Sequence, residues 1–422
     1  MSKAPNRSVP GAAGTANASQ SIYRFWANEQ VTSSAILNSH RTGVVSRAKK
    51  CQHVLAIQDT TDLDFTSHPA TTGLGYINKS CQQGIKVHSN FAVSGTGIPL
   101  GVIDQHCWNR TKRTGKRGQR RKQPIENKES YRWLQSATAA EVALSGQVQV
   151  IHVGDREADI FELFAQPRSA AVELLIRAEH NRKVQHELGY LIPTIEQAPV
   201  VGQQTLELRR NPQRSARTAQ LQLRAMRITV EVPRHGVSSK PLAAQSLNAL
   251  LVEECVAPND GGPPIRWLLL TTLPIDSAQQ AWQCVEWYSY RWLIERFHYT
   301  LKSGCQIEAL QLQSKARLLN ALATYSIVSW RLMWLLYQAR LTPEVACEVI
   351  LEPVEWKLLR RKFVPKSRSR KPPTLQQAVV WIAQLGGFLA RKNDGPPGIK
   401  TLWRGLTKLH DLLEGVQLSA KH

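Results

Sequence analysis

Short apolar runs separated by polar residues and glycines dominate the first half of the chain. The runs V-L-A-I-Q-D, G-I-K-V-H-S-N-F-A-V and P-L-G-V-I-D-Q-H-C-W, within residues 54–108, have the length and β-branched content of strands. Further along, the pattern predicts a helix over 130–144, a strand over 148–155, a helix over 156–164 and a strand over 171–177. Three adjacent strands followed by helix, strand, helix and strand predict an α/β fold, a mixed sheet flanked by helices.

The pattern changes between about residues 178 and 264. There the runs T-L-E-L-R-R, A-Q-L-Q-L-R-A and R-I-T-V-E-V alternate with period two, and arginine-rich turns separate them. We interpret this stretch as a small antiparallel β insert with one apolar and one basic face. The run R-W-L-L-L-T-T, at 266–272, then predicts a strand that returns to the main body.

The two ends of the chain have different patterns. Residues 1 to about 20 are rich in small residues and proline and are expected to fray, whereas 21–50 predict short helices. A long apolar helix is expected over 318–338, a basic proline-containing linker over 359–373, and amphipathic helix with glycine breaks in the last fifty residues. The expected division is a helical N-terminal region (1–50), a core (51–340) and a basic linker with a helical C-terminal region (341–422).

Acidic residues end two of the predicted strands. Asp59 closes V-L-A-I-Q-D, and Asp155 closes V-Q-V-I-H-V-G-D. In open α/β sheets, ligands bind at the carboxyl ends of strands, so these positions are candidates for a functional site. Two plainer interpretations stay open, because an ordinary turn accounts for Asp59 and a helix N-cap accounts for Asp155.

A second group of candidate residues lies in the run Y-S-Y-R-W-L-I-E-R-F-H-Y-T-L-K, which has no glycine or proline and predicts a helix. At about 100° per residue, four of its side chains and His298 beside them share a sector of roughly 80°: Tyr288, Arg291, Glu295 and Lys302. A carboxylate among cationic and aromatic groups is suited to holding a metal ion and a phosphodiester. The alternative is an exposed i,i+4 salt bridge between Arg291 and Glu295.

The charge balance indicates the class of partner. The chain has 422 residues with 54 Lys and Arg against 32 Asp and Glu, a net charge of +22. Nucleic acid is the common partner of such a basic chain. There is no run of 18 apolar residues and no hydrophobic signal core in the first 30 residues, so we expect a cytoplasmic, nucleoid-associated protein without a membrane partner.

The residue types also restrict the metal. The seven cysteines are scattered without a C-x-x-C pair or a Cys/His cluster, which argues against zinc. Two strand-end aspartates and a helix glutamate instead form the arrangement used in two-metal phosphoryl transfer. Hard divalent ions such as Mg²⁺ prefer oxygen ligands, and grouped carboxylates repel one another until a cation binds.

These motifs together resemble the DDE transposases of bacterial insertion sequences, in the IS-four group that the Tn-five transposase typifies. I-Q-D-T-T around Asp59 and G-D-R-E-A-D-I around Asp155 look like the blocks of the first two catalytic aspartates. The Y-(2)-R-(3)-E-(6)-K signature of the group is matched without a gap by Tyr288, Arg291, Glu295 and Lys302. The resemblance implies a ribonuclease-H-like core with a β insert before the helix of Glu295.

The resemblance also implies a mechanism and the roles of residues. Asp59, Asp155 and Glu295 would be the catalytic, metal-holding residues for two Mg²⁺ (or Mn²⁺) ions. The activity would be cut-and-paste transposition by a homodimer on double-stranded DNA, at the transposon ends and at the target. Trp267 would stack a flipped base, and R-A-E-H-N-R resembles the stretch R-S-K-H-P-R near the hairpin, although Glu179 replaces a basic residue. The implied DNA-contacting residues are Tyr288, Arg291, Lys302, Trp267, His298, Arg177, His180 and Arg182.

Some segments depart from the family pattern or allow two interpretations. Only A-S-Q-S-I-Y-R-F-W-A-N-E resembles the end of the family's N-terminal DNA-recognition region, so we expect 1–50 to be a shortened form of it. The alternative function is therefore an N-terminally shortened, non-transposing regulator that binds DNA or dimerises. A host repair nuclease of the same fold is a third possibility. The basic stretch 110–122 is either a contact with the DNA backbone or a solvated loop, and W-I-A-Q-L-G-G-F resembles the family's C-terminal dimerisation region.

Overall fold

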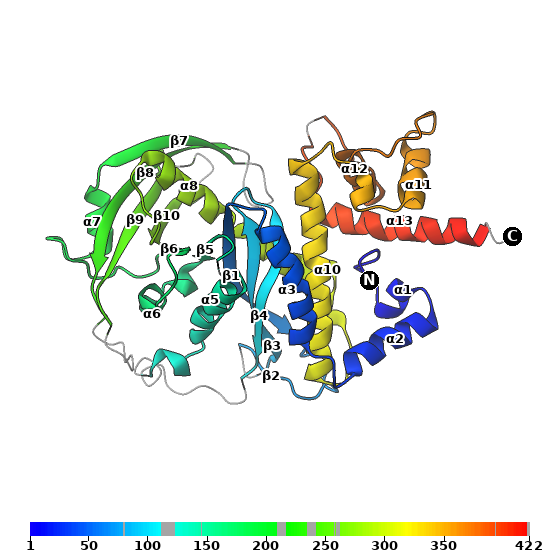
Figure 1. Ribbon diagram of the computed structural model, residues 1–422, viewed down its shortest axis with the longest axis horizontal. Coiled ribbons are helices and arrows are strands. Elements are labelled where there is room, and N and C mark those ends of the chain that lie inside the picture. Colours follow the sequence, from blue (N-terminus) through cyan, green and yellow to red (C-terminus); the bar gives the residue numbers. More distant parts are fainter. Residues whose placement is uncertain are drawn as a thin grey trace.

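A single mixed sheet organises the molecule (Figure 1). The computed structural model describes residues 1–78, 81–110, 123–144, 146–208, 217–233, 242–256, 258, 262–392 and 394–419. Within these ranges ten strands pair in the order β2-β3-β1-β5-β6-β10-β9-β8-β7, and β4 pairs with β3. The predicted α/β class with a mixed sheet is confirmed. The strands are β1 His53–Asp64, β2 Gly75–Tyr76, β3 Gln83–Ser94, β4 Pro99–Trp108, β5 Gln149–Gly154, β6 Val172–Arg177, β7 Val200–Leu208, β8 Arg217–Val230, β9 Gln245–Glu254 and β10 Arg266–Thr271.

The core of the sheet is a parallel trio with antiparallel strands on both sides. β1, β5 and β6 run parallel, while β3 and β10 pair antiparallel with the outer members of the trio. β1 is longer than predicted. Its parallel pairing with β5 ends at Ile57, but the strand continues along β3 to Asp64. Asp59 therefore lies beyond the end of the parallel pairing and not at the end of its strand.

Helices cover the two faces of this sheet, and the alternation along β1 assigns each residue to a face. Val54 and Ala56 pack in a cluster with residues of α3 (Ser33–Ala48) and α5 (Tyr131–Leu144). Leu55 and Ile57 belong to the larger cluster that includes α9 (Trp292–Tyr299) and α10 (Lys315–Leu341). Odd-numbered positions of β1, Asp59 among them, therefore share the face that α9 covers.

The β insert differs from its prediction in two respects. The runs A-Q-L-Q-L-R-A and R-I-T-V-E-V are one continuous strand, β8, and the apolar run S-L-N-A-L-L-V forms an additional strand, β9. β9 pairs with β10 from Arg266↔Glu253 to Thr271↔Asn248, so the insert extends the central sheet and is not a separate small sheet. The short α7 (Leu191–Gln197) precedes it and packs on β8 and β9.

The N-terminal segment is ordered, contrary to the expected fraying. α1 (Val9–Ala13) and α2 (Ala16–Ala27) lie beside the C-terminal helices (Figure 1). Val9 and Trp26 are buried, and the Trp26 indole donates a 3.1 Å hydrogen bond to Thr324 in α10. Lys3 pairs with a glutamate 349 positions further along the chain at 3.2 Å. The prediction of fraying was wrong because it rested on composition alone, whereas the buried side chains of Val9 and Trp26 anchor the segment.

The C-terminal region is helical, with α11 (Pro353–Phe363), α12 (Leu375–Leu385) and α13 (Ile399–Ser419). α11 occupies the first part of the expected linker. Gly405 lies inside α13 and is not a break, because a Cβ there would collide with the carbonyl of Ile382 in α12. The glycine thus permits close contact between two helices. None of the helices in the described ranges has the length and apolarity needed to cross a membrane.

Candidate active site

The sheet register brings Asp59 and Asp155 to the same level. The parallel pairs run from His53↔Gln149 to Ile57↔Val153, a constant offset of 96 positions. Continued past the last pair, that offset sets Asp59 level with Asp155, which directly follows β5. Side-chain alternation gives both the same face, because Ile57 and Val153 lie in the same core cluster two positions earlier. The two strand-end aspartates predicted from sequence are therefore neighbours.

Glu295 reaches this face from α9, but the surrounding helix is not the continuous one predicted. α8 (Ala278–Ser289) ends before Arg291, α9 begins at Trp292, and a π-helical turn, Thr300–Gly304, follows. Phe297 of α9 stacks on Phe91 of β3 with ring centroids 4.8 Å apart, which fixes the helix on the sheet. The shared helical sector thus holds for Arg291 and Glu295, whereas Tyr288 belongs to a different helix.

The electrostatics of the site centre on Asp59. Burial, followed by the negative charges of Asp155 and Glu295, raises the pKa of Asp59 from 3.8 to about 7. The Thr60 backbone N–H, a 2.7 Å donor to Asp59 Oδ1, and the Arg291 guanidinium act in the opposite direction on this pKa. Neighbouring carboxylates oppose the ionisation of Asp59, and a bound cation would stabilise its ionised form.

Glu295 has a cationic partner within its own helix. Its carboxylate accepts a hydrogen bond from the Arg291 guanidinium, so the i,i+4 salt bridge that was the alternative interpretation is formed. Among the described residues, no three His, Cys, Asp or Glu side chains are grouped as metal ligands. The donor set itself fits a hard divalent ion, because three carboxylates supply the oxygen ligands that such an ion prefers. A cation at Glu295 would compete with this contact to Arg291.

His298 and Lys302 contact β1 at different positions along the strand. His298 is buried beneath Asp59, with Nδ1 3.9 Å from Asp59 Oδ2 and Nε2 3.4 Å from Ser89 Oγ. Burial, followed by the charge of Lys302, lowers the pKa of His298 to about 3, so the ring is neutral. Lys302 donates to the Asp62 carbonyl at 2.6 Å and lies 3.4 Å from Glu308. DNA could contact His298 only if the ring were uncovered, whereas Lys302 is partly exposed.

Tyr288, Trp267 and Arg177 form an aromatic and cationic group beside the carboxylates. The Trp267 and Tyr288 rings meet edge to face at 5.3 Å. Burial raises the pKa of the Tyr288 hydroxyl, while the neighbouring guanidinium groups of Arg291 and Arg177 lower it. Arg177 ends β6 and donates to the Arg266 carbonyl at 3.3 Å. The structure therefore brings these three residues together, with Tyr288 only 3% exposed and Trp267 partly exposed.

The stretch after β6 is organised by an aspartate from the Asp155 motif. Asp159 Oδ2 accepts the backbone N–H groups of Glu179 and His180 at 2.8 and 2.9 Å. Asp159 Oδ1 pairs with Arg182 at 2.6 Å, and both side chains are buried. His180 is exposed. Arg182 is thus held inside the turn, while His180 projects from it.

Asp159 is not among the site residues predicted from sequence. The expected helix over 156–164 is instead a 3₁₀ turn, Arg156–Ala158, followed by the short α6 (Phe161–Ala165). Asp155 caps that turn by accepting the Glu157 N–H at 2.9 Å, as the N-cap interpretation expected. The signal for Asp159 was the second aspartate of D-R-E-A-D, but its partners lie more than 19 positions away.

The basic stretch 110–122 lies largely outside the described residues. Arg110 is described, and its guanidinium donates to the carboxylate of Glu129 and to the Ile77 carbonyl. In the insert, Arg224 and Arg227 donate to the Ala198 carbonyl and to Ser246. Arg110, Arg224 and Arg227 therefore have local partners among the described residues.

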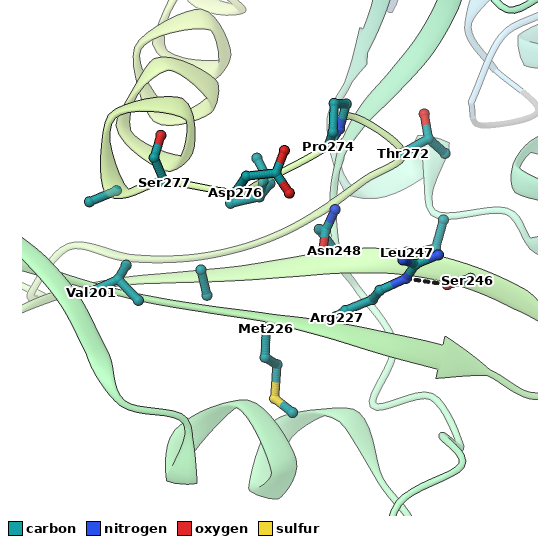
Figure 2. A pocket seen from close by; sticks show the side chains of 13 residues that line it. Val201, Met226, Arg227, Ser246, Leu247, Asn248, Thr272, Pro274, Asp276 and Ser277 are labelled. Atoms are coloured by element: carbon teal, nitrogen blue, oxygen red, sulfur yellow. Dashed lines mark hydrogen bonds between the residues drawn. The ribbon is translucent and has the colours of Figure 1, made fainter.

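A cavity of about 470 Å³ is lined by residues of β8, β9 and the segment that follows β10 (Figure 2). Arg227, Asn248, Thr272 and Asp276 contribute polar groups to it. Thr272 follows the end of β10, and β10 is antiparallel to β6, so the cavity lies away from the carboxyl ends of β5 and β6. The cavity is distinct from the carboxylate site.

Two family models match the chain. The model described as Transposase DDE domain matches residues 74–330, and the model described as Transposase Tn5 dimerisation domain matches residues 327–422. The first covers more than half of the chain and contains Asp155 and Glu295, but begins after Asp59. The second contains α11, α12 and α13.

Proposed function

The chain belongs to the DDE transposases, with a C-terminal dimerisation domain of the Tn5 type, and from that premise we propose that it is a cut-and-paste DNA transposase. Membership confirms the resemblance to the IS-four group and the ribonuclease-H-like nature of the mixed-sheet core. The observation that carries the proposal is the convergence of three carboxylates on one sheet face. β1 supplies Asp59, the end of β5 supplies Asp155, and α9 supplies Glu295.

The catalytic chemistry follows from this donor set. Asp59, Asp155 and Glu295 would hold two Mg²⁺ or Mn²⁺ ions, which when bound would activate the attacking oxygen and stabilise the leaving oxygen. Water first displaces the 3′ oxygen at the transposon end, and the new 3′-hydroxyl attacks the opposite strand to form a hairpin. The hairpin is reopened, and the same 3′-hydroxyl attacks target DNA. In each step one P–O bond forms as another breaks.

The chain's own residues would orient the DNA. Arg291 can bind a phosphate in bidentate fashion once Glu295 turns to a cation, and Lys302 supplies a point charge. Trp267, partly exposed beside Tyr288, offers a face on which an unpaired base can stack. Arg177 and His180 lie on the adjoining stretch, where Asp159 fixes the backbone. These roles remain proposals that substitution can test.

We also propose that the active species is a homodimer on two synapsed DNA ends. The dimerisation-domain match includes α13, whose outer surface exposes Leu412, Val416 and Leu418 at 39%, 44% and 65%. Exposed apolar side chains in a helix of such a domain are suited to a partner helix. Light scattering of the full chain with and without end DNA measures the stoichiometry.

The deciding experiment is strand cleavage of a labelled duplex that carries the candidate inverted repeat flanking the coding sequence, with Mg²⁺. Wild type should give nicked and hairpin products, whereas Glu295→Ala should bind DNA but cleave at least ~1,000-fold more slowly, since several kcal/mol of transition-state stabilisation are lost. Glu286→Ala, in the neighbouring helix α8, is the matched control and should cleave normally. Binding without cleavage by the wild type would favour the non-transposing regulator, and loss of binding alone in Glu295→Ala would refute the role given to Glu295.

A further inference from the structure

Arg132, in the first turn of α5, uses all of its guanidinium nitrogens on neighbouring groups. Nε donates to Thr60 Oγ1 at 3.1 Å, Nη2 to the Glu157 carboxylate at 2.8 Å, and Nη1 to the Glu129 carbonyl at 2.8 Å. The side chain is only 10% exposed. Its guanidinium carbon lies 5.2 and 5.9 Å from the ring centroids of Trp108 and Trp133. Three hydrogen bonds and two aromatic rings therefore fix the position of the Arg132 guanidinium.

Two of these partners, Thr60 and Glu157, each donate a backbone hydrogen bond to one of the site aspartates. The backbone N–H of Thr60 donates to Asp59 Oδ1 at 2.7 Å. The backbone N–H of Glu157 donates to Asp155 Oδ1 at 2.9 Å. Arg132 thus joins the residue that holds Asp59 to the residue that holds Asp155, across a sequence separation of 72 positions on one side and 25 on the other.

The hydrogen bonds behind Asp59 have a fixed direction. Because the Gln58 amide oxygen can only accept, His88 Nε2 carries the proton of the neutral ring and Nδ1 accepts from the Thr60 hydroxyl at 2.9 Å, while Thr60 Oγ1 accepts from Arg132. His88 Nε2 then donates to Gln58 Oε1 at 3.0 Å. Burial lowers the pKa of His88 well below its usual value, which keeps the ring in the neutral form that this chain needs. Both sequence neighbours of Asp59, Gln58 and Thr60, are therefore anchored on the opposite face of the sheet.

We propose that Arg132 is a positioning residue that sets the spacing and orientation of Asp59 and Asp155 for divalent metal ions. This inference rests on the proposed function, because it takes those two carboxylates as the metal ligands. Arg132 acts through Thr60 and Glu157 and does not touch the ion. Partners of metal ligands commonly change metal affinity 10- to 100-fold when removed, roughly the size of effect expected here.

The direction in which removal of Arg132 changes the affinity for a divalent ion distinguishes a positioning role from a purely electrostatic one. The cationic Arg132 lies close enough to Asp155 for the two charges to interact. If only charge mattered, removal of this cation would tighten binding of a divalent ion. If Arg132 positions the carboxylates, its removal weakens binding. Arg132→Lys keeps the charge but cannot bridge Thr60 and Glu157 at once, so positioning predicts that it also weakens binding.

The test is Mn²⁺ binding to the full-length protein without DNA, followed by the electron paramagnetic resonance signal of free Mn²⁺. Wild type should bind Mn²⁺, and Asp59→Asn should abolish binding. Arg132→Gln and Arg132→Lys should bind about 10-fold more weakly or worse. The matched control is Arg47→Gln, which removes an arginine stacked on Trp330 at 4.2 Å and bonded to the Leu100 carbonyl, and it should bind as wild type does.

A second variant keeps the test decisive if Arg132→Gln does not fold. Thr60→Val removes one arm of the bridge without changing the charge, so it should weaken Mn²⁺ binding several-fold. Combined with Arg132→Gln, it should add little, because both substitutions break the same connection. If the Arg132 and Thr60 variants bind Mn²⁺ as tightly as the wild type or more tightly, the positioning role of Arg132 is wrong, but the proposed metal site still stands. If the wild type binds no Mn²⁺, or if Asp59→Asn leaves its Mn²⁺ binding unchanged, the proposed metal site is wrong. The positioning role of Arg132 then fails with it.

Discussion

At the scale of single residues, the site is governed by a carboxylate that is hard to ionise. Asp59 is 20% exposed, faces Asp155, and lies over a neutral buried histidine. The pKa of Asp59 is about 7 in the folded protein. Ionising this carboxyl near neutral pH therefore costs free energy in the folded state that it does not cost in the unfolded chain. A bound cation would stabilise the ionised form of Asp59, so this carboxylate is suited to metal-dependent chemistry.

Asp59→Asn should stabilise the protein without divalent ions, increasingly as the pH rises from 4 to 8. The folded pKa of Asp59, about 7, exceeds its usual 3.8, so the folded state binds this proton more tightly and wild-type stability falls as pH rises through that window. At pH 8 the gain should approach, and not exceed, ~4 kcal/mol. Urea unfolding at several pH values measures it. Asp276→Asn, an exposed control, should change stability by less than ~0.5 kcal/mol at every pH.

At the scale of elements, two short segments depend on a single residue each. The stretch after β6 is held by the buried Asp159, which accepts two backbone N–H groups and the Arg182 side chain. The crossing of α12 and α13 depends on glycine at position 405, where a side chain would meet the Ile382 carbonyl. In both cases one substitution should disturb one element and leave the central sheet intact.

Asp159→Asn should destabilise the protein by roughly 3 kcal/mol. The substitution leaves Arg182, whose side chain is 8% exposed, as a buried charge without its carboxylate. Urea unfolding gives the energy, and limited trypsin digestion should show new cleavage near Arg177 and Arg182. The double substitution Asp159→Asn with Arg182→Met should recover part of the loss. A double variant as unstable as the single one would contradict this account.

Gly405→Ala should destabilise the C-terminal region by about 2 kcal/mol or more, since the added methyl forces α13 away from α12. Gly415→Ala, in the same helix, is the matched control. A Cβ at Gly415 meets nothing within 4 Å, so alanine there should stabilise the helix by up to ~1 kcal/mol. Thermal unfolding by circular dichroism compares them. Equal effects of the two changes would show that Gly405 is not a packing contact.

At the scale of the whole molecule, charge and connectivity matter most. The net charge of +22 favours DNA without sequence information, while the sheet places the carboxylates, Trp267 and Arg177 around the carboxyl ends of β5 and β6. The N-terminal segment is docked on the C-terminal helices through Lys3 and through Arg7, which pairs with Asp411 at 2.6 Å. The two ends of the chain therefore stabilise one another.

DNA affinity should fall steeply with salt, with log K linear in log salt concentration. If Lys302 contacts a phosphate, Lys302→Ala should reduce the magnitude of this slope by about 1. Fluorescence anisotropy with a labelled end duplex at several salt concentrations measures both slopes. Lys3→Ala is the control, because it removes the same charge, but Lys3 pairs with Glu352 and Glu355 at the C-terminal helices and not beside the carboxylate site. An unchanged slope in Lys302→Ala would remove that residue from the phosphate contacts.

The sequence by itself determined the class of fold and the family. Apolar alternation reports which face of a local element is buried, so most core strands and the long helix α10 were predictable, as was the signature around Glu295. Other features came only from tertiary structure: the break between α8 and α9, the joining of the insert to the central sheet, the docked N-terminus, and the partners of Arg132, Asp159 and Glu295. Periodicity is a property of neighbours within a few positions, whereas these contacts join residues tens to hundreds of positions apart, and only the packed chain decides which charges meet.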